Sequence, residues 1–310
     1  MKRNLFVAKL AEYQRVKMLS YPTAEKIDVV LDTDAATEVD DQFAISHFLS
    51  SPERIELKAI YAAPFAMNEK TKDPAVGMEM SYQEIYKIAR LMKNDFSAVY
   101  RGSKEYLKSF DAPVDSEAKD HLVQLAKSYT WENPLYVACI GAITNVASAI
   151  LSDPEIVNRI VVVWLGGDDF YYTPNVYNVY QDVKAAQVIF DSGVPLVHVP
   201  CNYVSSHLLT SVPELHACLG NRNELCDYLI EVVENYGSNH FAWGKQIWDI
   251  AVSGYFMNAG YAKTELTPAP MITDELTYSF DGSRHLIAKV TSLRRDSIFR
   301  DLFTKIGNIW

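Results

Sequence analysis

Short apolar runs alternate with amphipathic segments along most of this chain. Runs such as Val29-Val30-Leu31 are too short to span a membrane and too β-branched for a helix interior, which is typical of buried parallel strands. We expect strands near residues 27–32, 55–61, 99–100, 135–140, 159–165, 195–199 and 283–290. Apolar residues at helical spacing predict helices beginning at residue 40 or 41, over 77–92, 115–127, 146–151, 183–191, 225–236 and 248–257, and at the end of the chain.

This alternation predicts an α/β fold with a mostly parallel, doubly wound (Rossmann-like) sheet and helices on both faces. No linker, repeat or low-complexity run divides the chain, so we expect a single domain over residues 1–310. Residues 1–26 are expected to be a helical extension packed on that domain. Its apolar residues recur at helical spacing: Leu5, Phe6, Leu10, Tyr13 and Val16.

Composition indicates an ordinary globular protein, with 49% hydrophobic and 22% charged residues. The net charge of −10 argues against a nucleic-acid or membrane partner and favours a small neutral or cationic substrate. After Lys2 and Arg3 the chain has no apolar core of signal-peptide length, and no stretch is long enough for a membrane span. The four cysteines form no CxxC pair and no zinc spacing, which predicts a reduced, cytoplasmic protein.

Five acidic residues crowd the junction between the first strand and the first helix after it: Asp32, Asp34, Glu38, Asp40 and Asp41. In open α/β sheets, ligands bind at this carboxyl end of the strands. So many carboxylates repel one another unless some are protonated or a hard divalent cation binds them. The helix macrodipole alone would explain Asp40 and Asp41, but not Asp32 and Asp34 on the strand side.

Two families place an Asp-x-Asp motif after a strand. Haloacid-dehalogenase-type phosphatases have Thr or Val two residues after the second Asp, where this chain has Ala36. The stretch DTDAATEVDDQFA, residues 32–44, instead resembles the opening motif of the inosine–uridine-preferring nucleoside hydrolase family. It has the form with two extra residues before the paired aspartates.

A second motif, IGAITN at residues 140–145, resembles the GxLTN motif of that family. In the family a backbone carbonyl beside this glycine ligates calcium, and the resemblance places that carbonyl at Ile140. Taken alone, a glycine turn followed by Asn145 as a helix cap would also explain the motif.

A third motif, VYNVYQDVKAA at residues 176–186, resembles EFNxxxDPxAA of the family. Asn178 matches the Asn that holds sugar hydroxyls, although a loop or cap Asn is the alternative. The family's Glu is replaced by Val176, so one acceptor for the ribose is missing. Asn175 is expected to substitute for it in part.

The fourth motif, IWDIA at residues 247–251, matches the family's HDP-type segment, whose Asp is the last protein ligand of the metal. A lone Asp249 among apolar residues is costly unless it is paired or ligating. The His that helps the base leave in purine-active members is here Trp248, which we expect to stack on a base or to shape the pocket. Asn68 and Glu79, near the second strand, are further candidates for sugar hydroxyl contacts.

The resemblance runs from about residue 27 to about residue 251 and implies hydrolysis of the N-glycosidic bond of ribonucleosides, to ribose and free base. Such bonds break through an oxocarbenium-like transition state. The implied cofactor is Ca2+, which binds the ribose 2′ and 3′ hydroxyls and a water. Its implied ligands are Asp34, Asp41, Asp249 and the carbonyl of Ile140.

Among the acidic residues, Asp34 is the expected general base, Asp40 is expected to bind a ribose hydroxyl, and Asp32 is expected to support the ligands by hydrogen bonding. The resemblance also implies a homodimer or homotetramer and a role in nucleoside salvage. Two alternatives stay open. One is a non-hydrolytic homologue that binds ribosides or sugars, and the other is a metal-dependent phosphatase.

Overall fold

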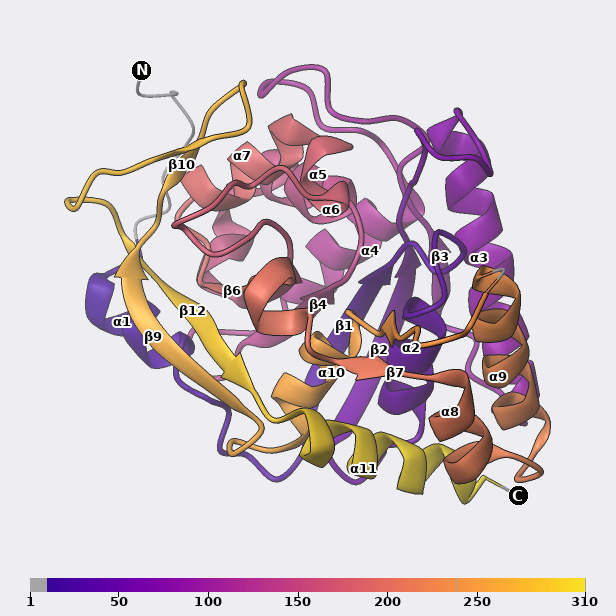
Figure 1. The fold of residues 1–310 in the computed structure, drawn as a ribbon. Helices are drawn as coiled ribbons and strands as arrows, with labels where there is room; N and C mark the ends of the chain where they lie inside the picture. Colours follow the sequence, from indigo (N-terminus) through magenta and orange to yellow (C-terminus); the bar gives the residue numbers. More distant parts are fainter. Residues whose placement is uncertain (1–9, 238, 310) are drawn as a thin grey trace.

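The computed structural model describes residues 10–237 and 239–309, and its centre is an eight-stranded sheet (Figure 1). The strand order is β3-β2-β1-β4-β5-β6-β12-β9. The strands are β1 (Ile27–Thr33), β2 (Ile55–Ala62), β3 (Val99–Arg101), β4 (Leu135–Cys139), β5 (Ile160–Leu165), β6 (Leu196–Val199), β9 (Ala262–Pro268) and β12 (Leu286–Leu293). All neighbours run parallel except β9 and β12. The predicted mostly parallel α/β sheet is therefore confirmed.

Helices cover both faces of this sheet (Figure 1). One face packs on α2 (Asp41–Leu49), α3 (Pro74–Leu91), α9 (Glu224–Tyr236), α10 (Ile250–Met257) and α11 (Arg295–Gly307). The other packs on α4 (Glu117–Ala126), α5 (Thr144–Ser152) and α7 (Val183–Asp191). Val29 and Leu31 point into the first layer and Val30 into the second, which explains why β1 is apolar throughout instead of alternating.

The end of the chain differs from the sequence prediction. One late strand was expected, but β12 pairs with a seven-residue antiparallel edge strand, β9, at the left of Figure 1. The sequence AKTELTP of β9 is largely exposed and polar, so it carries no buried-strand pattern. Helix α8 (Val212–Leu219), the short α6 (Tyr177–Tyr180) and the two-residue pairs β7–β8 (Leu209–Thr210, Lys245–Gln246) and β10–β11 (Met271–Ile272, Tyr278–Ser279) were also not predicted.

The N-terminal extension forms α1 (Glu12–Met18). Leu5 and Phe6, part of the predicted apolar face, lie outside the described residues. Tyr13 was expected on the packed face but is 68% exposed, whereas Arg15 is buried and donates to the carbonyl of Gly193. No helix in the described part of the chain is long and apolar enough to cross a membrane.

Parallel pairing brings the carboxyl ends of β1, β4 and β5 to one edge, where Asp32 lies opposite Cys139 and Cys139 opposite Trp164. Behind this edge, the buried Asn145 at the start of α5 links three segments. Its amide nitrogen donates to Asp32 over 2.8 Å, and its oxygen accepts from the backbone and hydroxyl of Ser103 over 2.7 and 2.9 Å. Asn145 is therefore an interior link and not only a helix cap.

Replacing Asn145 with Ala should leave Ser103 N–H and an Asp32 oxygen buried without partners. Each such loss costs roughly 1–3 kcal/mol, so we expect the free energy of unfolding to fall by about 2–4 kcal/mol. Urea unfolding followed by circular dichroism measures this. Asn133→Ala, at an exposed Asn in a turn, is the matched control and should change it by less than about 0.5 kcal/mol. Equal effects of the two variants would contradict the role of Asn145.

Candidate active site

The loop between β1 and α2 carries most of the acidic residues. Asp34 folds it back, because its carboxylate accepts from the Thr37 hydroxyl over 2.8 Å and its carbonyl accepts from Thr37 N–H over 2.8 Å. Asp40 precedes α2 and Asp249 precedes α10, yet neither side chain makes a capping hydrogen bond. These carboxylates are therefore not simple helix caps.

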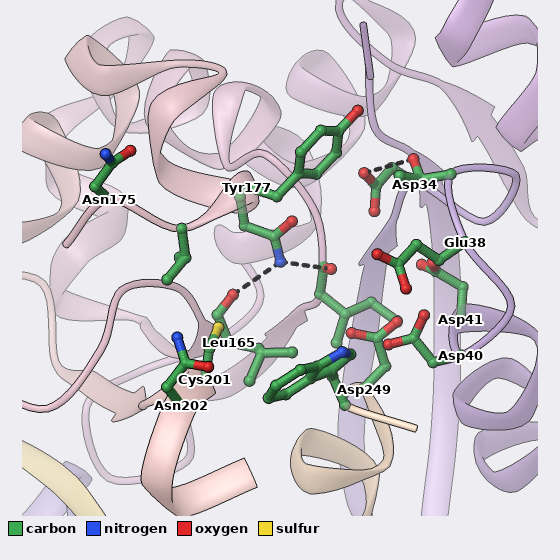
Figure 2. A pocket seen from close by; sticks show the side chains of 15 residues that line it. Asp34, Glu38, Asp40, Asp41, Leu165, Asn175, Tyr177, Cys201, Asn202 and Asp249 are labelled. Atoms are coloured by element: carbon green, nitrogen blue, oxygen red, sulfur yellow. Dashed lines mark hydrogen bonds between the residues drawn. The ribbon is translucent and has the colours of Figure 1, made fainter. Parts of the chain in front are cut away.

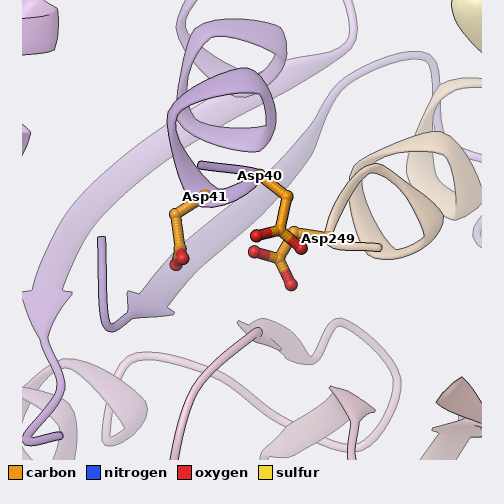
Figure 3. Close-up of side chains that lie close together, drawn as sticks. All are labelled: Asp40, Asp41 and Asp249. Atoms are coloured by element: carbon orange, nitrogen blue, oxygen red, sulfur yellow. The ribbon is translucent and has the colours of Figure 1, made fainter. Parts of the chain in front are cut away.

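Figure 3 shows Asp40, Asp41 and Asp249 converging from the starts of α2 and α10. One carboxylate oxygen of each lies within 4.8 Å of the others, and all three side chains are buried. Asp41 also accepts from the Thr33 hydroxyl over 2.5 Å at the end of β1. Two helix starts and one strand end thus place three carboxylates around a single point.

Burial of these carboxyls is unfavourable for their charged forms. It raises the pKa of Asp34 to about 7 and that of Asp40 to about 6, and repulsion between neighbouring carboxylates adds to both shifts. The pKa values of Asp41 and Asp249 are raised well above the usual range for the same two reasons. Lys245 lowers the pKa of Asp40, but its ammonium is paired with Glu38 at 2.7 Å.

The donor set fits a hard divalent cation. The available groups are the oxygens of buried Asp carboxylates and the carbonyl of Ile140, and Ca2+ and Mg2+ take such oxygen ligands in proteins. A cation there would remove the repulsion that raises the carboxyl pKa values.

The carboxylates form one side of a cavity of about 270 Å³ (Figure 2). Its lining combines an acidic group with apolar and amide side chains. The residues are Asp34, Thr37, Glu38, Asp40, Asp41, Ile140, Leu165, Asn175, Val176, Tyr177, Asn178, Cys201, Asn202, Trp248 and Asp249. No Lys or Arg is among these lining residues.

Asn178 fastens two strand ends behind the cavity. Its amide nitrogen donates to the carbonyl of Ile140 over 2.9 Å and to that of Leu165 over 3.0 Å (Figure 2). Both amide hydrogens are thereby used, so only the side-chain oxygen of Asn178 remains to accept from a ligand. Asn178 also contacts the same Ile140 carbonyl that the sequence resemblance assigns to the metal.

The glycine of the second motif is required by close approach. A Cβ at Gly141 would lie 2.7 Å from an oxygen of Asp34. The carbonyl of Gly141 accepts from the indole nitrogen of Trp164 over 3.1 Å, which fixes this turn against β5. Gly141 therefore lets Asp34 reach the end of β4.

The remaining predicted residues are spread around the cavity. Trp248 and Asn175 line it, whereas Asp32 lies behind it, hydrogen-bonded to Asn145. Asn68 lines a neighbouring cavity of about 690 Å³ and donates to the hydroxyl of Tyr177 over 3.0 Å. That neighbouring cavity shares Thr37, Glu38 and Tyr177 with the first.

Glu79 is not brought to the acidic cavity. It lies on α3 and forms an ion pair with Arg101 at 2.8 Å, and it lines a different hollow on the outer face of that helix. The expectation of a sugar contact rested on a resemblance of this stretch to the sugar-binding loop and helix of the family. Glu79 on α3 instead points toward β3, where Arg101 at the end of that strand donates to its carboxylate.

Sequence reasoning missed Cys201 and Asn202, which line the cavity after β6. They belong to the kinked segment Cys201–Ser205, in which Asn202 and Tyr203 have non-helical backbone angles and which the Asp168 carboxylate holds. Asp168 accepts from the backbone N–H of Asn202 over 2.7 Å and from its side-chain amide over 2.9 Å. The available signal was their position directly after a buried strand, at the same sheet edge as Asp34.

Comparison with known proteins identifies the family. The model of the family described as inosine-uridine preferring nucleoside hydrolase matches residues 29–283. Probable uridine nucleosidase 2 of Arabidopsis thaliana is 24% identical over 233 residues, which are 68% of this chain and 70% of that protein. Pyrimidine-specific ribonucleoside hydrolase RihB of Escherichia coli is 27% identical over 133 residues, 41% of this chain and 42% of that protein.

Solved structures agree on the fold. A plant nucleoside hydrolase (PpNRh1) superposes with a TM-score of 0.73 at 17% identity, covering 92% of this chain and all of that one. A purine-preferring ribonucleoside hydrolase from Gardnerella vaginalis gives 0.70 at 19% identity, covering 91% and 98%. The family model spans most of this chain and confirms the resemblance seen in the motifs. The chain therefore belongs to the inosine-uridine preferring nucleoside hydrolase family and is an enzyme of the ribonucleoside hydrolase class, a glycosidase acting on N-glycosyl compounds.

Proposed function

We propose that the acidic cavity hydrolyses the N-glycosidic bond of ribonucleosides in a calcium-dependent reaction. The observation that carries this proposal is the convergence of Asp34, Asp40, Asp41 and Asp249 on one cavity, in a chain of this family. The absence of Lys and Arg from the described lining disfavours a phosphate ester as substrate.

The proposed ligands of the cation are Asp34, Asp41, Asp249 and the carbonyl of Ile140, which all line the cavity. Such a cation would orient the ribose hydroxyls and lower the pKa of water. The three carboxylates that lie within 4.8 Å of one another include Asp40 in place of Asp34.

We assign Asp40 to a ribose hydroxyl. Asp40→Asn should therefore raise the KM for ribonucleosides by a larger factor than it raises the Kd for calcium.

Asp34 is the proposed general base, because its carboxylate faces the cavity on a loop fixed by Thr37. It takes one proton of the attacking water as the bond between sugar and base breaks, and the departing base takes up a proton from solvent. The surrounding carboxylates stabilise the positive charge that develops on the ribose. Trp248 bounds the cavity beside Asp249 and shapes the space left to the substrate.

The base is assigned to the neighbouring cavity, which shares the lining residues Thr37, Glu38 and Tyr177 with the first. Its lining adds Tyr228, Tyr236 and the amide of Asn68, which suit a planar polar ring. This assignment places the ribose against the carboxylates and the base toward α9.

A riboside-binding protein without turnover is the second candidate. Trp248 occupies the position at which purine-active members of the family carry a His that helps the base leave. The cavity therefore lacks that His as a general acid. Binding without release of sugar would select this alternative. The homodimer or homotetramer and the cytoplasmic location stay predictions of the sequence.

Replacing Asp34 with Asn should lower the release of reducing sugar from ribonucleosides by roughly 10²–10⁴-fold, the usual contribution of a general base. A panel of purine and pyrimidine ribonucleosides in calcium supplies the assay. Asp111→Asn, at an exposed carboxylate outside the cavity, is the matched control and should retain full activity. An Asp34→Asn variant as active as Asp111→Asn would rule out the base assignment.

Without a cation, the stability of the protein should fall as the pH rises. The pKa values of Asp34, about 7, and Asp40, about 6, lie above the value of about 3.9 for an unfolded Asp. The folded state therefore binds more protons than the unfolded state, and stability is lost between about pH 4 and pH 7. Urea unfolding in a chelator should give a lower free energy at pH 8 than at pH 6.

Calcium should reverse this loss at pH 8, by about 2.7 kcal/mol at a concentration of 100 times Kd. The variant Asp41→Asn removes one buried charge and one proposed ligand. It should be more stable than the wild type in chelator at pH 8 and should respond less to calcium. A wild-type protein indifferent to calcium at both pH values would refute the metal assignment.

A further inference from the structure

The two sides of the cavity differ in chemistry. The carboxylates occupy one side, whereas Leu165 and Cys201 lie across from Asp40 and Asp249 (Figure 2). Val176, at the start of α6, completes the apolar lining and packs against the hydrophobic layer behind it. Burial raises the pKa of the Cys201 thiol, so this side carries no charge.

Several polar atoms near the apolar side are committed within the protein, while the side-chain oxygen of Asn178 stays available. The Leu165 carbonyl accepts from Asn178, and both the backbone N–H and the amide nitrogen of Asn202 donate to Asp168. The side chains of Asn175 and Asn202 are exposed, so water already solvates their free oxygens. The side chain of Val176 itself offers no hydrogen bond, so a hydroxyl placed against it loses water without gaining a partner there.

The sugar of a ribonucleoside has three free hydroxyls, and the proposed function assigns two of them. The vicinal 2′ and 3′ hydroxyls face the carboxylates, and the base extends into the neighbouring cavity past Thr37 and Tyr177. The 5′ carbon is attached at the other end of the ribose ring. It is the group left to meet the side formed by Leu165, Val176 and Cys201.

We propose that Val176 makes this site selective for ribonucleosides whose 5′ position carries hydrogen or an apolar group in place of the hydroxyl. The substrate class is 5′-deoxy and 5′-alkylthio ribonucleosides. This inference rests on the proposed function, because it uses the placement of the 2′ and 3′ hydroxyls. Burying a hydroxyl without a partner is unfavourable, whereas burying a methyl or thioether there is favourable.

The test compares kcat/KM within pairs that share a base: uridine with 5′-deoxyuridine, and adenosine with 5′-deoxyadenosine and 5′-methylthioadenosine. Because the base is constant, the ratio reports only the 5′ group. We expect the 5′-deoxy and 5′-alkylthio compounds to exceed the hydroxyl compounds by roughly 10- to 100-fold. A ratio of one, or preference for the hydroxyl, overturns the proposal while leaving ribonucleoside hydrolysis intact.

Substitutions at Val176 identify the residue responsible. Val176→Gln supplies an uncharged acceptor and Val176→Glu a charged one, and both should shift the ratio toward the 5′-hydroxyl compounds. Val176→Leu keeps the side apolar and should retain the wild-type preference. Thermal melting checks that each variant is folded. Unchanged ratios in folded Gln and Glu variants would exclude Val176 as the determinant.

A binding measurement separates this inference from the proposed function. If no nucleoside is turned over, hydrolysis fails, but calorimetry in calcium with the methyl furanosides of ribose and of 5-deoxyribose still reads the 5′ preference, because both keep the five-membered ring. Tighter binding of the 5-deoxyriboside by the wild type, lost in Val176→Gln, supports the inference. Equal binding of the two glycosides overturns it.

Discussion

Repulsion among buried carboxylates is the constraint on which this structure depends. Asp34, Asp40, Asp41 and Asp249 are all buried around one cavity, and their pKa values are raised because burial and mutual repulsion disfavour the charged forms. Such a cluster lowers the stability of the fold, so it is retained only where function requires it. Family membership makes ribonucleoside hydrolysis that requirement.

The scaffold holds the carboxylates in place from behind. Asn145 and Asn178 each connect separate strand ends through their amides, and Gly141 leaves the space that Asp34 occupies. None of the three carries a charge: Asn145 and Gly141 adjoin the carboxyl groups of Asp32 and Asp34, and Asn178 holds two backbone carbonyls. The motifs of the sequence therefore combine groups that would act on a substrate with groups that position them.

The two sides of the cavity differ in polarity, and this difference can discriminate between substrates. Its acidic side suits a cation and a vicinal diol, whereas Val176 on the other side offers no acceptor for a hydroxyl. Loss of one carboxylate from a family motif therefore need not mean loss of activity. It can equally alter which end of the sugar is recognised.

The sequence by itself determined the parallel α/β sheet, the start of α2 at residue 40 or 41 and the family, because apolar periodicity and the spacing of aspartates are local properties. Only the tertiary structure decided that the amide of Asn178 donates to two strand ends and that Glu79 pairs with Arg101. It also decided that Cys201 and Asn202 line the cavity. The edge strand β9 escaped prediction because it buries too little to need an apolar pattern. Contacts between segments far apart in the chain leave no periodic signal, so the partner of each polar group is set by packing.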